Sequence, residues 1–115
     1  MSAPDEKHEL CIALTTARSA DEAQRLARLL VERRLAACVN ILPGVRSIYR
    51  WQGKVEDVEE AMLVIKTSRA QAGAVQAALR EAHSYDLPEF LLLPIAGGGT
   101  EYMAWLRDSL KIEPK

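Results

Sequence analysis

The chain has 115 residues, about half of them apolar, and its 15 basic side chains are balanced by 16 acidic ones. One domain with a single core fits this length, whereas the balanced charge argues against a nucleic-acid partner, which would require a basic surface. No apolar run approaches the roughly 20 residues of a membrane-spanning helix, and the polar start is unlike a secretory signal, so we expect a cytoplasmic protein without a membrane partner.

The first part of the chain predicts a tail, a strand and a helix. Residues 1–9 are polar and predict a flexible tail ahead of a single domain over residues 10–112. The apolar run at residues 10–16 predicts a strand. Ser19 is followed three residues later by a glutamate, the capping-box pattern, which predicts a helix that begins there and ends near Leu35.

The middle of the chain predicts one long antiparallel hairpin. Residues 37–51 are strand-like throughout, except at Pro43 and Gly44. Proline cannot donate a hydrogen bond to a neighbouring strand, so an edge strand or a bulge is expected there. Residues 52–54 predict a turn, and residues 55–67 predict the returning strand.

The last part of the chain predicts a helix, a strand and a terminal helix. Ser68 with Gln71 forms a second capping-box pattern at the start of the first of these helices. Residues 87–96 predict the final strand, and Thr100 is expected to cap a short amphipathic helix that ends at Leu110. The resulting order, βαββαβ with a terminal helix, predicts an α+β fold of the ferredoxin-like kind.

The length of the central hairpin predicts an oligomer. A strand of about fifteen residues spans about 50 Å, whereas a compact chain of this size is only about 35 Å across. The tip of the hairpin must therefore bend or project beyond its own core, and it carries apolar side chains that another chain could cover by strand pairing. These side chains are Ile48, Tyr49, Trp51, Val55 and Val58.

Four sequence segments resemble the CutA family of divalent-cation tolerance proteins. They are LAACVNILPGVRSIYRWQGK (35–54), MLVIKT (62–67), HSYDLPE (83–89) and TEYMAWL (100–106), and the likeness runs in register over about residues 10–110. The resemblance implies a homotrimer of ferredoxin-like subunits, joined through the hairpin at 37–67. It also implies a role in tolerance of copper or another divalent cation.

Two alternatives to a metal function follow from the same resemblance. The implied trimer is similar to that of PII signalling proteins, which bind small effectors between subunits, so a PII-like effector-binding signalling trimer is the first alternative. A mammalian member is linked to anchoring of acetylcholinesterase, so a scaffold or anchoring trimer without metal function is the second. The chain has no GxSxG motif and no recognisable catalytic set, and we do not expect an enzyme.

His83 and Cys38 are the candidate metal ligands, because imidazole and thiolate are the side chains that copper prefers. His83 also fits a histidine that simply ends a helix, and Cys38 also fits a core thiol. The chain departs from the copper-binding pattern of the family: Thr15 and Ala82 stand where such members carry cysteine and histidine, and Ser84 stands where proline is common. These departures argue against a tight copper site of that design.

Further residues are candidates for lining a cleft between subunits. Lys66 is a possible cationic neighbour of Cys38 once the trimer has assembled, and Glu89 belongs to the proline–glutamate pair of the family pattern. The strand tryptophan on the projecting hairpin is typical of an interface. The full set of cleft candidates is Asn40, Trp51, Lys66, Tyr85 and Glu89.

Two other groups of residues have simpler expected roles. The carboxylates of the returning strand could hold hard cations weakly, but we expect them to form a solvated face that protects a sheet edge. These are Glu56, Asp57, Glu59 and Glu60. Tyr102 and Trp105 in the terminal helix are expected to be core aromatics.

Overall fold

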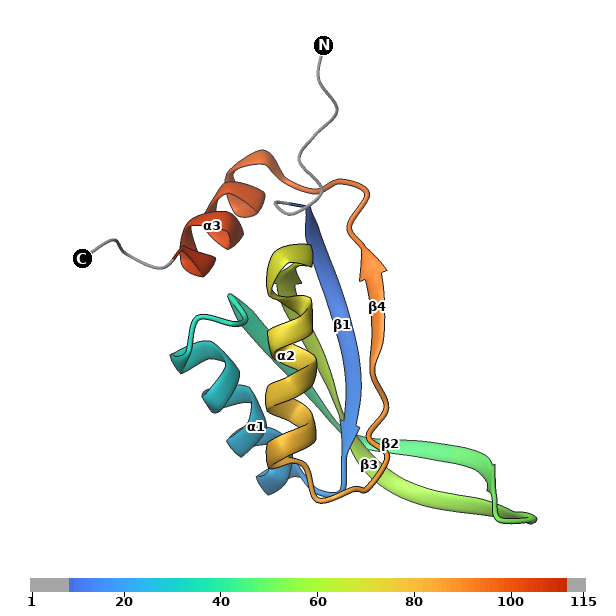
Figure 1. Cartoon of the computed structure of the whole chain (residues 1–115). Helices are drawn as coiled ribbons and strands as arrows, with labels where there is room; N and C mark the ends of the chain where they lie inside the picture. Colours follow the sequence, from blue (N-terminus) through green and yellow to red (C-terminus); the bar gives the residue numbers. More distant parts are fainter. Residues whose placement is uncertain (1–8, 112–115) are drawn as a thin grey trace.

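A four-stranded antiparallel sheet with two helices on one face and a third helix at one end forms the body of the molecule (Figure 1). The computed structural model describes residues 9–111, and most of the tail expected at 1–9 lies outside these residues. The strand order across the sheet is β2-β3-β1-β4. The elements are β1 (Leu10–Ala17), α1 (Ala20–Glu32), β2 (Cys38–Trp51), β3 (Lys54–Ser68), α2 (Arg69–Ala82), β4 (Leu91–Pro94) and α3 (Thr100–Leu110).

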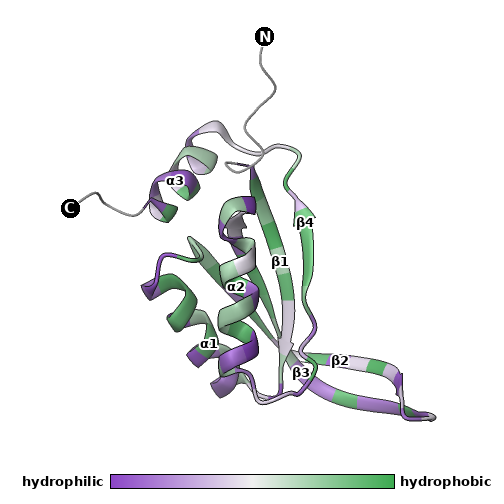
Figure 2. Ribbon diagram, in the orientation of Figure 1, coloured by the Kyte–Doolittle hydropathy of each residue, from purple (hydrophilic) through white to green (hydrophobic). Residues whose placement is uncertain are grey.

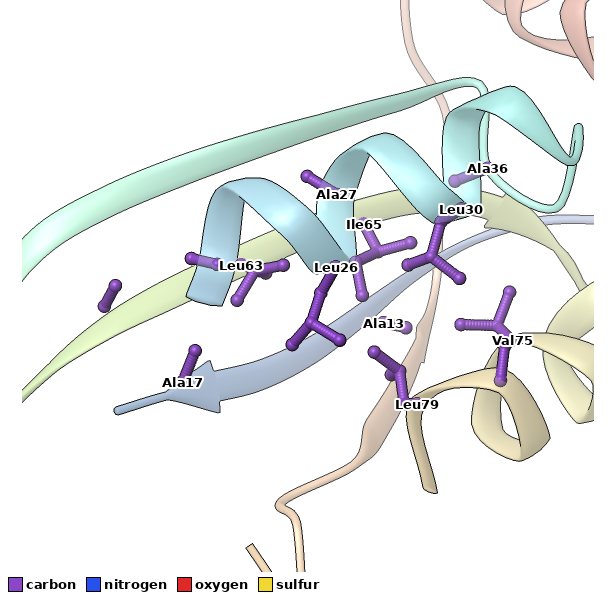
Figure 3. Packing of buried hydrophobic residues seen from close by; sticks show 13 residues of the cluster. Ala13, Ala17, Leu26, Ala27, Leu30, Ala36, Leu63, Ile65, Val75 and Leu79 are labelled. Carbon is purple, nitrogen blue, oxygen red and sulfur yellow. The ribbon is translucent and has the colours of Figure 1, made fainter. Parts of the chain in front are cut away.

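The core lies between the sheet and the two helices α1 and α2 (Figure 3). Leu26 and Leu30 project from α1, Leu63 and Ile65 from β3, and Val75 from α2, and all five are fully buried. Each such side chain contributes about 1.5–3 kcal/mol through the apolar surface that it removes from water. Within the described residues, no helix is both long and apolar enough to span a membrane.

The opposite face of the sheet carries a second apolar surface, the open sheet face, which α1 and α2 do not cover. Side chains alternate between the two faces of a strand, so the residues between the core positions point to this face. Among residues 9–111 only its end is covered, where Leu106 and Leu110 of α3 pack on Leu10. Its apolar residues are Ile12, Leu14, Leu42, Met62, Val64, Leu91 and Leu93.

The hairpin formed by β2 and β3 projects from the body of the molecule (Figure 1). The β1 strand ends at Ala17, opposite Ala61, whereas β2 and β3 remain paired from Val45 and Glu60 out to the turn. We call residues 45–60 the outer hairpin. The longest dimension of the described chain is 51 Å, which confirms that the hairpin extends beyond the body.

The interruption of the hairpin at Pro43 and Gly44 is a bulge, one of the two alternatives that the sequence left open, and β2 is also an edge strand of the sheet. The register of β2 against β3 shifts between Leu42 and Val45, so two residues of β2 have no partner in β3. Gly44 has a φ of +71°, a value that glycine adopts without a steric penalty. The bulge lies where the hairpin leaves the body, so it sets the direction of the outer hairpin.

Two elements are shorter than expected. Helix α1 ends at Glu32 and not near Leu35, because Arg34 has a φ of +58° and Leu35 donates its N–H back to the Leu30 carbonyl at 2.9 Å. The final strand was expected at 87–96 and comprises only Leu91–Pro94. It pairs with β1 alone, and the residues before it leave the sheet to pass beside the end of β1.

The capping predictions have mixed outcomes. Ser19 accepts the Glu22 N–H at 3.1 Å, as expected. Ser68 precedes α2, but its hydroxyl donates to the Gln71 side chain at 2.7 Å and caps no backbone group. Thr100 is the first residue of α3, and Gly99 occupies the cap position without a side-chain bond. The helices therefore start where the pattern indicated, although only the first of them has a side-chain cap.

The prediction of core aromatics in α3 is wrong. Tyr102 and Trp105 are both exposed, and their rings stack on each other with centroids 5.6 Å apart. Leu106 and Leu110 supply the buried face of this helix instead. The helix contacts only one end of the sheet, so it buries one narrow stripe of side chains.

Replacing the buried Leu26 by alanine is expected to lower the free energy of unfolding by about 3 kcal/mol, because the change leaves a cavity in the core. Urea unfolding at a fixed protein concentration measures this loss. Val31→Ala on the same helix is the control, since Val31 is exposed, and it should cost less than about 1 kcal/mol. Equal losses for the two variants would contradict the packing described for α1.

Candidate functional site

A cavity of about 750 Å³ lies between the outer hairpin and the loop at residues 84–89 that connects α2 to β4. The hairpin supplies aromatic side chains and a buried carboxylate, and the loop supplies a tyrosine and two further carboxylates. The connection between β1 and α1 supplies an arginine. These residues are Arg18, Tyr49, Trp51, Glu60, Tyr85, Asp86 and Glu89.

The central contact of the cavity joins Tyr85 to Glu60. The Tyr85 hydroxyl donates a hydrogen bond of 2.8 Å to Oε2 of Glu60, whose side chain is almost fully buried, with 7% exposure for the residue. Burial, together with this bond and the charge of Glu60, raises the pKa of Tyr85 to about 12. The phenol therefore stays protonated at neutral pH and holds the carboxylate in place.

Glu89 brings a second carboxylate to the same cavity. Burial, together with the charge of Glu60, raises the pKa of Glu89 above its ordinary value. The backbone position of Glu89 is fixed, because its carbonyl accepts a hydrogen bond of 2.6 Å from the buried Thr15 hydroxyl. Two carboxylates that repel each other across a cavity favour a positively charged ligand.

His83 lies buried behind the cavity and does not line it. Its Nε2 lies 2.6 Å from the Thr16 carbonyl, and its Nδ1 accepts the Tyr85 N–H at 3.0 Å. Because a carbonyl can only accept, Nε2 carries the proton and Nδ1 is the acceptor. Both ring nitrogens are therefore engaged, and the role of His83 in one chain is to position Tyr85.

A buried carboxylate joins the two loops that border the cavity. Glu22 accepts the backbone N–H groups of Arg18 at 2.9 Å and Ser84 at 3.0 Å. Burial raises the pKa of Glu22, but the hydrogen bonds from Ser84 and Arg18 outweigh it, and the net pKa is lowered. The guanidinium of Arg18 lies 5.6 Å from the centroid of the Tyr85 ring, so the two loops also meet at the cavity surface.

The remaining candidates form a separate group on the open sheet face. Cys38 pairs in register with Lys66, and Asn40 lies two residues further along the same strand. The Lys66 ammonium donates to the Tyr102 hydroxyl at 3.0 Å, and this bond raises the pKa of Lys66 against the opposing effect of burial. Lys66 is thus a neighbour of Cys38 within one chain, and trimer assembly is not needed to bring them together.

The two candidate metal ligands do not meet in one chain. Cys38 pairs with Lys66, which in turn lies opposite Ile12, whereas His83 bonds to Thr16. Four residues of strand separate these places, or roughly 13 Å. Among residues 9–111, no three His, Cys, Asp or Glu side chains are arranged to hold a metal ion.

Glu60 was expected on a solvated face, and for this residue that expectation is wrong, because only 7% of it is exposed. Glu60 shares the face of β3 that carries Met62 and Val64, which is the open sheet face, so alternation alone did not indicate its burial; the loop at residues 84–89 covers it through Tyr85. Asp57 and Glu59 are exposed, as expected. Arg18 and Glu22 were not recognised as site residues. Glu22 belongs to the capping-box pattern at Ser19, but that pattern does not indicate its bond to Ser84, and nothing local indicates the approach of Arg18 to Tyr85.

Comparisons with known proteins agree on one family. The model of the family described as CutA1 divalent ion tolerance protein matches residues 11–109. The divalent-cation tolerance protein CutA of Pectobacterium atrosepticum is 46% identical over 87% of this chain and 91% of its own length. The chloroplastic protein CutA of Arabidopsis thaliana is 38% identical over 87% of this chain and 55% of its own length.

A solved structure shows the same fold. The divalent cation tolerance protein (Cut A1) from Thermus thermophilus superposes with a TM-score of 0.85 and is 44% identical in sequence. The match covers 87% of this chain and 97% of the other. The sheet apart from Leu10, the long hairpin and the loop that borders the cavity lie within residues 11–109, which the family model matches.

Glu22→Gln is expected to reduce the free energy of unfolding at pH 7 by about 1–3 kcal/mol, because a buried charged acceptor of two N–H groups is lost. The folded pKa of Glu22 lies below the ordinary value of 4.5, so its contribution is complete above pH 4.5 and is lost as the pH falls through the folded pKa. Chemical unfolding of both proteins between pH 3 and pH 7 measures the difference.

The difference between wild type and Glu22→Gln should therefore shrink in acid. Glu32→Gln is the matched control, because Glu32 lies on the same helix and its side chain is 70% exposed. That variant should match wild type closely at every pH. A difference between wild type and Glu22→Gln that stays constant down to pH 3 would show that the charge of Glu22 does not stabilise the two loops.

Proposed function

This chain belongs to the CutA1 divalent ion tolerance family, and from this premise we propose that it acts as a non-catalytic homotrimer that binds divalent cations modestly at its clefts. The strand order β2-β3-β1-β4 supports the ferredoxin-like arrangement on which such a trimer would be built. The observation that carries the cation-binding part is the pair of carboxylates, Glu60 and Glu89, in one cavity.

Two uncovered surfaces support the trimer. The outer hairpin pairs with no other strand among the described residues, and Ile48 and Val55 on it are 68% and 64% exposed. The open sheet face exposes Leu91 and Leu93 of β4, and Figure 2 shows β4 as a hydrophobic strand. Contiguous apolar surface and unpaired strand edges are typical of regions that another chain covers.

The donor atoms of the cavity suit hard divalent cations better than copper. Carboxylate and hydroxyl oxygens are the ligands of hard cations, whereas copper prefers sulfur and imidazole nitrogen. Cys38 lies apart on the open sheet face, and both nitrogens of His83 are hydrogen bonded. We therefore place the cation at Glu60 and Glu89, with His83 acting through Tyr85 and with Cys38 as a ligand only where a neighbouring chain completes a second site.

A small-effector-binding signalling role is the second candidate, and the size of the cavity favours it. A volume of about 750 Å³ falls within the roughly 300–1,000 Å³ typical of small-molecule sites, which is far more than a bare ion fills. Of the cleft candidates, Trp51, Tyr85 and Glu89 line this cavity, whereas Asn40 and Lys66 do not.

The cellular compartment is not fixed by membership of the family. A cytoplasmic location is our proposal for this chain, based on its sequence. The Arabidopsis relative is named as a chloroplastic protein, so members of the family occur in different compartments.

Light scattering after gel filtration should give a mass close to three times that of the 12.8 kDa chain. A charge at Ile48 or Val55 on the outer hairpin should shift this mass toward the monomer, because a charge is costly to bury in an apolar interface. Val31→Asp places the same charge on the helix side of the molecule, where Val31 is exposed, and should leave the mass unchanged. A wild-type protein of single-chain mass at micromolar concentration would refute the trimer.

Metal content after equilibrium dialysis against manganese or zinc should show bound cations in the wild type. Glu60→Gln and Glu89→Gln should each weaken binding at least about tenfold, because each removes a charged ligand, whereas Glu59→Gln on the exposed side of β3 should not. Cys38→Ser should also retain binding. If Cys38→Ser loses metal binding while Glu60→Gln and Glu89→Gln retain it, the metal site lies on the open sheet face and not in the cavity.

A further inference from the structure

We propose that the cavity between the outer hairpin and residues 84–89 binds a small organic ammonium ion, that is, a protonated amine attached to an apolar body. This inference deepens the effector-binding role proposed above and rests on it. It names the chemical class of the effector from the charge, the aromatic side chains and the shape of the cavity.

The charge of the cavity favours a cation. Its lining contains three carboxylates, Glu60, Asp86 and Glu89, and one guanidinium, Arg18. Glu60 is more than nine-tenths buried, and only its Oε2 accepts a hydrogen bond among the described residues. The second oxygen of this carboxylate is therefore free to accept a hydrogen bond from a ligand inside the cavity, and an ammonium group is a donor that also neutralises the charge.

The aromatic side chains supply a second attraction for the same type of ligand. Tyr49 and Trp51 lie two residues apart on one face of β2, both line the cavity, and they are 43% and 48% exposed. Ammonium groups bind over the faces of such rings. The Tyr85 ring already has the Arg18 guanidinium 5.6 Å from its centroid, which leaves Tyr49 and Trp51 as the rings available to a ligand.

The shape of the cavity favours an organic cation over a metal ion. Leu87 and Pro88 contribute apolar walls to a space of about 750 Å³. A hydrated metal ion would leave these walls in contact with water, whereas an amine with an apolar body would bury them. The absence of three clustered metal-binding side chains among residues 9–111 agrees with this preference.

Isothermal titration calorimetry of the assembled, metal-free protein at pH 7 tests the proposal with two probes of nearly equal shape, 2-phenylethylamine and 2-phenylethanol. The amine is protonated and the alcohol is neutral, so their difference reports the ammonium group alone. We expect one amine per chain and an affinity at least tenfold higher than that of the alcohol. Equal affinities, or no binding of the amine, would overturn the proposal.

Substitutions of residues that line the cavity test whether the amine binds there. Glu89→Gln at the rim should lower the affinity for the amine about tenfold and leave that for the alcohol unchanged, and Trp51→Leu should lower both. Glu59→Gln is the control, since Glu59 is exposed on the same hairpin and does not line the cavity. Amine binding that is unchanged in both Glu89→Gln and Trp51→Leu would place the ligand elsewhere and overturn the inference.

The same calorimeter separates this inference from the proposed cation function. Zinc that binds through Glu60 and Glu89 while the amine does not bind would overturn the inference and leave the cation function intact. Amine binding without zinc binding would overturn the metal assignment and support the organic ligand. Circular dichroism of each variant confirms that a lost affinity does not come from a lost fold.

Discussion

The early end of β1 is the constraint on which both the projecting hairpin and the cavity depend. Beyond Ala17 and its partner Ala61, the strands β2 and β3 continue without a neighbour. Glu60 is the first residue of β3 past this point, and its side chain would face water if the loop at residues 84–89 did not pass beside it. Tyr85 from that loop takes the place of the missing strand and hydrogen bonds to the carboxylate. The cavity is thus the space between this loop and the outer hairpin, which at this point has no neighbouring strand of the sheet beside it.

Buried side chains that do not line the cavity hold the loop at residues 84–89 in place. His83 fixes the backbone of Tyr85, Thr15 fixes that of Glu89, and Glu22 joins the loop to the residues before α1. Each contact uses a buried side chain and a backbone partner, and buried hydrogen bonds of this kind are costly to break. A site supported in this way keeps its geometry before any ligand arrives, which is the condition for tight and selective binding.

Much of the fold could be predicted, because periodicity and turn residues are local signals. The long hairpin and the bulge at Pro43 follow from a fifteen-residue strand pattern with one proline in it. The short β4 could not be foreseen, since residues 87–90 continue the apolar pattern of the strand but leave the sheet to pass beside β1. The site was only partly visible for a similar reason. Tyr85 and Glu89 were identified, but the burial of Glu60 and the separation of Cys38 from His83 depend on which strands stop first.

Tyr49 and Trp51 stand on the strand that leaves the body of the molecule, yet they also form a wall of the cavity. Any molecule that fills this cavity must therefore contact the outer hairpin, and any displacement of the hairpin must change the shape of the cavity. By thermodynamic reciprocity, each event changes the free energy of the other by the same amount. One part of the hairpin is therefore a wall of the cavity and the other part projects from the subunit, so that binding in the cavity and contacts made by the projecting part are coupled.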